Sequence, residues 1–223
     1  MSFESLGLDA SILKAVADQG YTEPTPIQKA SIPVIISGKD VIGVAQTGTG
    51  KTAAFTLPLL TKLVQSKNST HQGRVRCLIL APTRELVVQI AENVAAYSRY
   101  SGATVATCYG GVSERPQIAA LRRGCDFLIA TPGRLLDLGG QGHGDFSAVE
   151  YLVLDEADRM LDMGFLPAIN TIVRALPKER QTLMFSATLS REIETLTKQY
   201  QREPKLIEVG RRSNPAETVT QLL

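Results

Sequence analysis

The sequence has no tryptophan, two histidines and only three cysteines among its 223 residues. The cysteines form no CxxC pair and lie within apolar segments, which favours reduced core residues over disulfides or zinc ligands. No apolar run approaches the roughly 18 residues of a membrane-spanning helix, and the amino terminus lacks the basic and apolar stretches of a secretory signal. These absences predict a soluble, cytoplasmic protein without membrane contact.

The sequence also lacks a strong charge of either sign. Its 24 Lys and Arg residues against 22 Asp and Glu residues leave +2, too little to indicate a nucleic-acid partner. Aromatic residues make up 5% and apolar residues 43%, as in ordinary globular chains. A chain of this length forms one domain or a tight pair, with a core that needs no metal or disulfide. Composition therefore leaves the function open.

Short runs rich in Val, Ile and Leu predict buried strands along the chain. They lie at 40–45, 76–81, 104–109, 126–130, 151–155, 182–186 and 205–209. Helical spacing is found at 9–19, 26–37, 51–65, 84–100, 113–123 and 190–200. Strand followed by helix, repeatedly, predicts an α/β fold with a mostly parallel central sheet of about seven strands and helices on both faces. We expect the tail after residue 209 to close no element.

A phosphate-binding pattern follows the first strand. Residues Ala45 to Thr52 match GxxxxGK[ST], with alanine at the first position. Gly48 and Gly50 let the backbone curl so that its amides point inward at a helix start, and Lys51 adds a charge. This chemistry suits a triphosphate, whose magnesium ion the Thr52 hydroxyl would hold. A glycine-rich turn with a surface lysine is the alternative, but the strand before and the helix after favour a phosphate site.

An acidic motif follows the strand at 151–155. Because the carboxyl ends of parallel strands share one edge, this motif would lie beside Lys51. We expect Asp155 to hold magnesium through water, and Glu156 to orient and deprotonate the attacking water. The alternative is a solvated acidic turn that caps a helix.

Two further helix starts carry an arginine. Thr83 precedes Arg84, and Thr131 precedes Pro132, Gly133 and Arg134, with proline at the first helical position. Exposed amides at helix starts attract anions, and arginine adds a forked donor. With the Gly110-Gly111 turn, these segments would follow a sugar-phosphate backbone. On the residues alone, well-capped helices whose arginines pair with carboxylates are the better interpretation.

Seven motifs occur in a fixed order. GYTEPTPIQ, AQTGTGKT, PTREL, GG, TPGR, DEAD and SAT begin at Gly20, Ala45, Pro82, Gly110, Thr131, Asp155 and Ser186. This set resembles the amino-terminal RecA-like domain of DEAD-box RNA helicases, most closely a bacterial RhlE-like subgroup, from Phe3 to about Thr188. The resemblance implies a Q-motif flap at 1–30 packed on a RecA-like P-loop domain at 31–209, and the start of an interdomain linker at 210–223.

The resemblance implies ATP and Mg²⁺ as cofactors. It assigns Gln28 to the adenine edge, where an amide that both donates and accepts matches adenine but not guanine. It also assigns Tyr21 to stacking on the base and Glu23 to the pocket periphery. Phe3 matches the upstream aromatic of the family, although core packing explains it equally well. The catalytic residues would be Lys51, Asp155 and Glu156. The phosphate loop would contribute Ala45, Gln46, Thr47, Gly48, Thr49, Gly50, Lys51 and Thr52.

Single-stranded RNA is the partner that the resemblance implies, held by its phosphates and 2′-hydroxyls with little reading of sequence. The residues expected to contact it are Pro82, Thr83, Arg84, Gly110, Gly111, Thr131, Pro132, Gly133 and Arg134. Asp158, Ser186 and Thr188 would couple hydrolysis to strand separation, with both hydroxyls hydrogen-bonded to the acidic motif.

The second RecA-like domain of the family has no counterpart here, since the chain contains no HRxGRxxR segment. An arginine from a facing domain typically speeds phosphoryl transfer on the order of a thousandfold. We therefore expect a nearly inactive monomer that hydrolyses ATP and unwinds short RNA duplexes only with a second domain in cis. Two alternatives stay open: an ATPase acting on DNA or protein, which would not carry the motifs between Pro82 and Arg134, and a non-catalytic ATP-gated RNA clamp.

Overall fold

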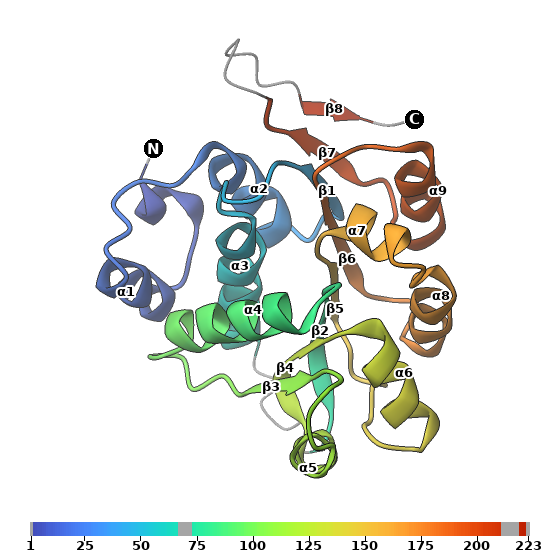
Figure 1. Cartoon of the computed structure of the whole chain (residues 1–223). Helices are drawn as coiled ribbons and strands as arrows, with labels where there is room; N and C mark the ends of the chain where they lie inside the picture. The colour runs from blue at the N-terminus through green and yellow to red at the C-terminus, as the bar shows by residue number, and fades with distance from the viewer. Residues whose placement is uncertain (1, 67–72, 211–218, 222–223) are drawn as a thin grey trace.

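The computed structural model describes residues 2–66, 73–210 and 219–221, the last three as backbone only. One sheet runs through the molecule in the strand order β3-β4-β2-β5-β6-β1-β7-β8 (Figure 1). The strands are β1 (Val41–Val44), β2 (Val75–Leu80), β3 (Val105–Cys108), β4 (Cys125–Ala130), β5 (Tyr151–Leu154), β6 (Gln181–Ser186), β7 (Lys205–Glu208) and β8 (Val219–Gln221). β1 to β7 pair in parallel, which confirms the expected mostly parallel α/β sheet.

The carboxyl-terminal strand β8 differs from the expectation that the tail closes no element. It pairs antiparallel with β7, with Lys205 opposite Gln221 and Ile207 opposite Val219. A segment this short carries too little pattern to be recognised, because its pairing with β7 is what defines it. The other residues of the expected linker, 211–218 and 222–223, lie outside the described residues.

Helices cover both faces of the sheet (Figure 1). On one face lie η1 (Phe3–Leu6), α1 (Ala10–Asp18), α2 (Pro26–Ile36), α3 (Lys51–Gln65) and α4 (Arg84–Tyr97). On the other lie α5 (Arg115–Arg123), α6 (Pro132–Gly140), α7 (Ala157–Asp162), α8 (Leu166–Ala175) and α9 (Arg191–Tyr200). The helices expected from the sequence are all present with ends shifted by a few residues, whereas α7 and α8 were not expected.

Alternate residues of the central strands enter two separate cores. On β6, Leu183 and Phe185 belong to the core beneath α1–α4, while Met184 belongs to the core beneath α5–α9. On β2, Cys77 and Leu78 divide in the same way. Both faces of these strands are buried, which explains why they read as continuous apolar runs rather than alternating ones.

The amino-terminal helices pack onto the sheet and share its core. Phe3 and Leu6 are buried in the same cluster as residues of α3 and α4. The Asp9 N–H donates to the Thr61 hydroxyl of α3 at 3.1 Å, and the Tyr100 hydroxyl donates to Asp18 of α1 at 2.6 Å. The first helices are thereby fixed against α3 and the end of α4.

The three cysteines are buried and unbridged, which confirms their expected place in the core. Burial raises the pKa of the Cys108 and Cys125 thiols to about 12, and it also raises the pKa of Cys77. In the described part of the chain, no helix has the length and apolar character needed to cross a membrane.

Candidate functional site

The sheet gathers six of the seven motifs on one rim. Each of these six begins at or just after the carboxyl end of a parallel strand, from β1 to β6. Because β5, β6 and β1 are neighbours, the phosphate loop, the acidic motif and Ser186–Thr188 form one half of the rim. Because β3, β4 and β2 are neighbours, the other three motifs form the second half, and the two halves meet between β2 and β5. This is the edge at which ligands bind in open parallel sheets.

The phosphate loop connects β1 to α3 in a curled conformation. Gly48 and Gly50 have φ angles of 81° and 90°, in the left-handed region that favours glycine. A Cβ at Gly48 would meet no atom within 4 Å, so the backbone angle, not crowding, explains the glycine there. Gln46 and Thr47 are exposed, and Ala45 is anchored by its N–H, which donates to Ser186 O at 3.0 Å. The middle of the loop is therefore exposed at the start of a long helix.

Lys51 lies beneath this loop and not on the surface. Its side chain is 7% exposed, and its Nζ donates to the Ala45 carbonyl at 2.8 Å. Thr52 follows in the first turn of α3 and is half-buried. The alternative of a surface lysine on a glycine-rich turn does not describe this geometry.

Gln28 ties α2 to the phosphate loop, a contact that the sequence did not predict. Its Oε1 accepts from Thr25 N–H at 2.9 Å, and its Nε2 donates to Gly50 O at 3.2 Å. The side chain is 4% exposed. A Cβ at Gly50 would lie 2.5 Å from Gln28 Nε2, so a side chain there would break the contact. The two partners are far apart in sequence, and no local pattern signals their pairing.

Asp155 is a buried carboxyl in the electric field of two neighbours. It is 2% exposed, and its Oδ1 accepts from Glu156 N–H at 3.0 Å. Burial raises the pKa of Asp155 to about 6; the Lys51 charge lowers the pKa and the Glu156 charge raises it further. Lys51 and Asp155 therefore come together as expected, and Asp155 is not the solvated turn residue of the alternative interpretation.

Glu156 adopts a left-handed conformation, with φ 51° and ψ 51°, which is uncommon for a residue other than glycine. Its carboxylate pairs with Arg159 at 3.2 Å, and its side chain is 15% exposed. Arg159 was not among the expected site residues, although the i,i+3 spacing on a helix is a signal that could have found it.

Asp158 joins the acidic motif to the loop after β6. Its Oδ2 accepts from Ala187 N–H at 3.1 Å and from the Thr188 hydroxyl at 3.2 Å. Only one of the two expected hydroxyl contacts is therefore present. Ser186 is buried, and its Oγ accepts from Thr188 N–H at 3.4 Å instead of bonding to the acidic motif. Ser186 is the last residue of β6 and is fully buried.

Tyr21 and Phe3 form an aromatic pair beside α4. Their ring centroids are 6.5 Å apart with an interplanar angle of 24°. Phe3 is 3% exposed and Tyr21 is 39% exposed, and the Tyr21 hydroxyl lies 3.1 Å from that of Tyr97. Phe3 thus packs in the core and also braces Tyr21, whereas Glu23 is exposed on the turn before α2.

The second half of the rim carries the two arginines. Thr83 caps α4 by accepting from Leu86 N–H at 3.3 Å, and the Arg84 guanidinium lies 5.4 Å from the centre of the Tyr109 ring. Arg134 donates to Val112 O at 3.5 Å. These contacts draw the starts of α4 and α6 toward the turn that contains Gly110 and Gly111.

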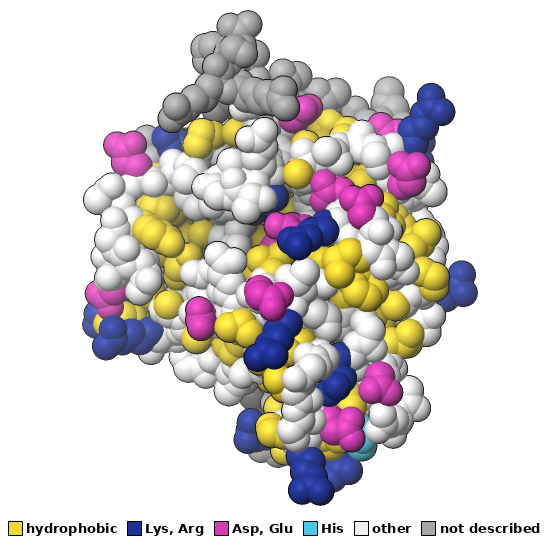
Figure 2. Space-filling view, in the orientation of Figure 1, with side chains coloured by type: hydrophobic (Ala, Val, Ile, Leu, Met, Phe, Trp, Pro, Cys, Tyr) yellow, Lys and Arg dark blue, Asp and Glu magenta, His cyan; other side chains and the backbone are white. Residues whose placement is uncertain are grey.

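The interpretation of these arginines as ion-pair partners is met only in part. Arg134 reaches Asp137 at 4.0 Å, at the limit of an ion pair, and Arg84 contacts an aromatic ring rather than a carboxylate. Thr131 stands at the cap position of α6 but makes no side-chain cap bond, while Pro82 and Pro132 are buried. On the face shown in Figure 2, basic side chains are interspersed with acidic and apolar ones and form no continuous patch.

Comparison with protein families identifies the family to which these motifs belong. The family model described as DEAD/DEAH box helicase matches residues 25–196. The chain belongs to this family. The matched span runs from the capping residue of α2 to the middle of α9, so it contains all strands from β1 to β6. The RhlE-like subgroup stays a prediction.

Individual relatives of the chain are DEAD-box or RNA helicases by name, in agreement with the family model. Over 98% of the chain, the sequence is 46% identical to the ATP-dependent RNA helicase RhlB of Pseudomonas aeruginosa, of which it covers 56%. Over 93% of the chain, it is 48% identical to the DEAD-box ATP-dependent RNA helicase 30 of Arabidopsis thaliana, of which it covers 35%. The chain thus spans about half or less of these relatives.

A solved DEAD-box structure also superposes on this domain. The crystal structure of a DEAD box protein from the hyperthermophile Methanococcus jannaschii has a TM-score of 0.86 and 38% sequence identity. The match covers 93% of this chain and 56% of that one. It confirms the expected RecA-like fold.

Proposed function

We propose that this chain is the ATP-binding half of an ATP-dependent RNA helicase. The observation that carries the proposal is that Lys51 and Asp155 are both buried and interact electrostatically beneath a loop whose residues 46–48 are exposed. A buried cation and carboxyl at a helix start suit a chelated polyphosphate better than any structural role. The family and the names of the RNA-helicase relatives support this assignment.

Adenine would be recognised by Gln28. Its amide has two N–H groups and two oxygen lone pairs, of which Gly50 O and Thr25 N–H use one each. One donor and one acceptor therefore stay available for the adenine edge, while Tyr21 offers a partly exposed ring for stacking. Glu23 would line the outside of this pocket.

The donor set fits magnesium. A threonine hydroxyl and a carboxylate are hard oxygen ligands of the kind that Mg²⁺ prefers, often through its own waters. Thr52 and Asp155 would hold the ion, which when bound neutralises charge on the outer phosphates. Lys51 would exchange the Ala45 carbonyl for phosphate oxygens, and the amides from Gln46 to Gly50 would surround the β-phosphate. Glu156, held by Arg159, would orient the attacking water and accept its proton.

RNA would lie across the second half of the rim. Arg84, Arg134 and the amides at the starts of α4 and α6 would contact successive phosphates, with Gly110 and Gly111 permitting close approach of the backbone. Pro82, Thr83, Thr131, Pro132 and Gly133 would shape these helix starts. The bonds from Asp158 to the loop that contains Thr188 would transmit hydrolysis to the RNA side, with Ser186 supporting that loop.

The complete activity, RNA-stimulated ATP hydrolysis and local unwinding of short duplexes, would need a second RecA-like domain in cis. An arginine from such a domain supplies transition-state charge that this half does not. We propose a cytoplasmic monomer that binds ATP–Mg but turns it over slowly in the absence of that domain.

Calorimetry with Mg²⁺ and either ATP or GTP tests the nucleotide site. We expect ATP to bind, GTP to bind at least about tenfold more weakly, and Lys51→Ala to weaken ATP binding at least about tenfold through loss of the buried charge. Lys39→Ala, an exposed lysine on the opposite rim, is the matched control and should leave binding unchanged.

Equal binding of ATP and GTP would contradict the assignment of Gln28, and no heat at millimolar ATP would contradict the whole site. RNA is tested separately in a longer chain that contains both domains. Its ATPase should rise with single-stranded RNA and not with DNA of the same sequence, whereas stimulation by DNA alone would favour a DNA-dependent ATPase.

A further inference from the structure

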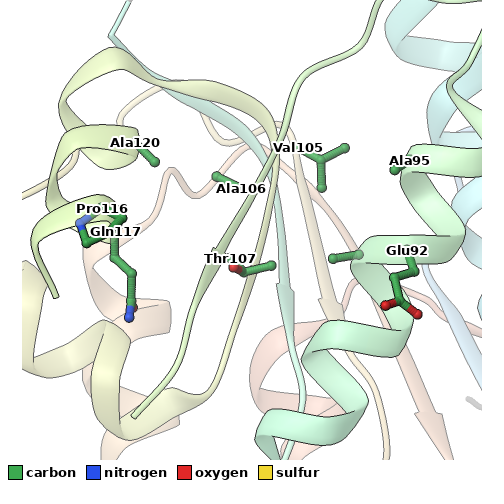
Figure 3. A pocket seen from close by; sticks show the side chains of 9 residues that line it. Glu92, Ala95, Val105, Ala106, Thr107, Pro116, Gln117 and Ala120 are labelled. Carbon is green, nitrogen blue, oxygen red and sulfur yellow. The ribbon is translucent and has the colours of Figure 1, made fainter. Parts of the chain in front are cut away.

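The edge strand β3 opens into a groove that none of the motifs lines. Its volume is about 420 Å³, and it lies between α4 and α5 with β3 as its floor. Figure 3 shows Glu92 and Ala95 on the α4 side, Pro116 and Ala120 on the α5 side, and β3 between them. We call this feature the β3 groove.

Part of the main chain of β3 faces this groove. The carbonyl of Thr104 accepts from Phe127 N–H of β4 and that of Cys108 from Thr131 N–H directly after β4, at 2.9 Å each, so alternate residues of the strand face β4. The residues between them face the other way. The N–H and C=O groups of Val105 and Thr107 therefore point into the groove. Among the described residues, no side chain or loop hydrogen-bonds to these four groups.

Tyr109, the next residue that faces outward, shows what this edge binds. Its N–H donates to Gln117 Oε1 at 3.0 Å, and its C=O accepts from Gln117 Nε2 at 3.1 Å. Gln117 is 7% exposed. One buried side-chain amide therefore pairs with the edge as a peptide group of a neighbouring strand would, and the two preceding positions have no such partner.

The walls of the groove are made of small side chains with one charge. Ala91 and Ala95 line the α4 side, and Ala120 lines the α5 side with Pro116. Glu92 is the one charged side chain among the described lining residues, and it is exposed. An added strand would point alternate side chains toward α4 and α5. On the α4 side a Lys or Arg would lay its stem on the alanines and its charge beside Glu92; on the α5 side an apolar residue would fit.

We propose that the β3 groove binds an extended peptide of alternating basic and apolar residues, which adds a strand to the edge of the sheet at β3. Main-chain hydrogen bonds to Val105 and Thr107 supply the affinity, and Glu92 selects the basic residue. Charge complementarity argues against a second copy of this chain as the occupant. β3 itself carries no basic residue between Val105 and Cys108, so pairing of two β3 edges would leave Glu92 without a partner.

A capped peptide of about seven residues that alternates lysine and valine is the probe, titrated into the chain by calorimetry and followed by amide hydrogen exchange in NMR. We expect binding in the micromolar to submillimolar range, since few hydrogen bonds are formed. The Val105 and Thr107 amides should gain protection, while those of Ala106 and Cys108, which already face β4, should not change.

Two controls separate strand addition from charge attraction. The same peptide can be N-methylated on alternate amides in two registers, and both versions keep its charge. In one register the methyl groups replace the N–H groups that bind the edge of β3, so that version should bind about tenfold more weakly. Glu92→Lys should weaken binding about fivefold or more. Glu194→Lys makes the same charge change at an exposed position of α9, away from the groove, and should have little effect.

The proposal is overturned if the peptide fails to bind at millimolar concentration, if both N-methylated registers bind as well as the parent peptide, or if the two charge reversals act equally. Protection of Val105 and Thr107 that grows with protein concentration and needs no peptide would identify a second copy as the occupant and would also overturn it.

Discussion

Asp155 shows how one buried carboxyl links the stability of the domain to pH. Its pKa is raised from the ordinary 3.8 to about 6 by burial. Below about pH 3 the carboxyl is protonated in both folded and unfolded chains, and it costs nothing. As the pH rises toward 6, the unfolded chain loses its proton first, so the free energy of unfolding falls. Above pH 6 the destabilisation is complete.

Replacing this carboxyl should therefore stabilise the domain. We expect Asp155→Asn to raise the free energy of unfolding at pH 7.5 by about 1–3 kcal/mol, since each pKa unit is worth about 1.4 kcal/mol. The asparagine oxygen can keep the bond from Glu156 N–H. Urea unfolding at pH 7.5 and pH 4 measures the effect, which should shrink to about 0.5 kcal/mol at pH 4. The exposed Asp162→Asn serves as control, and a loss of stability at both pH values would rule out the burial argument.

At the same scale, the sequence predicted the chemistry of the site better than its contacts. Lys51 and Asp155 were predictable because parallel strands deliver their carboxyl ends to one rim. The bond from Gln28 to Gly50 was not, because it joins residues 22 positions apart whose approach depends on how α2 packs. The Ser186 hydroxyl was assigned to the wrong partner because its complete burial at the end of β6 depends on the tertiary structure and is not signalled by the Ser-Ala-Thr sequence.

Among the elements, the strands and the long helices were predictable because burial on both faces and strong periodicity mark them. α7 and α8 were missed for an identifiable reason. α7 begins after Glu156 in a left-handed conformation and α8 begins after Phe165, and neither start has a side-chain cap bond. Without a capping side chain, the start signals are limited to Asp158 in the first turn of α7 and Pro167 in the first turn of α8, which are weaker than a cap residue.

The entry into β4 depends on a glycine at the end of α5. Gly124 has φ +78°, and a Cβ there would lie 2.4 Å from Arg74 N and 2.6 Å from Gly73 C, which are backbone atoms that cannot yield. Gly102 has φ +72° but open space around it. Gly124 also has ψ 167°, an extended conformation at positive φ that is essentially restricted to glycine, so backbone strain and crowding add at this position.

We expect Gly102→Ala to lower the free energy of unfolding by about 1 kcal/mol, the cost of a left-handed alanine. Gly124→Ala should cost at least about 2 kcal/mol more, because overpacking adds to the strain. Thermal and urea denaturation compare the two variants. Equal losses would mean that the backbone at Arg74 moves aside at no cost.

On the scale of the whole molecule, one sheet is shared by two cores. Met184 and Phe185 are neighbours on β6 but lie in different cores. Because β2, β4, β5 and β6 each belong to both cores, neither core can be lost while the sheet stays intact. The domain should therefore unfold as one cooperative unit.

This cooperativity is testable with substitutions on the two sides. Met184→Ala and Phe185→Ala should each lower the free energy of unfolding by about 2–5 kcal/mol. In both variants, urea transitions measured by circular dichroism and by tyrosine fluorescence should shift together. A variant in which one probe moves and the other stays would show that the two cores unfold independently.

The burial of all three cysteines has a practical consequence for measuring distances in this protein. Their thiols are both inaccessible and reluctant to ionise, so maleimide dyes at neutral pH should not modify them in the folded chain. Lys178 is exposed on the turn before β6, on the rim opposite the motifs. Lys178→Cys would thus introduce a single site for one dye of an energy-transfer pair, with no need to remove the native cysteines first; the other dye would be placed on a bound nucleotide or RNA.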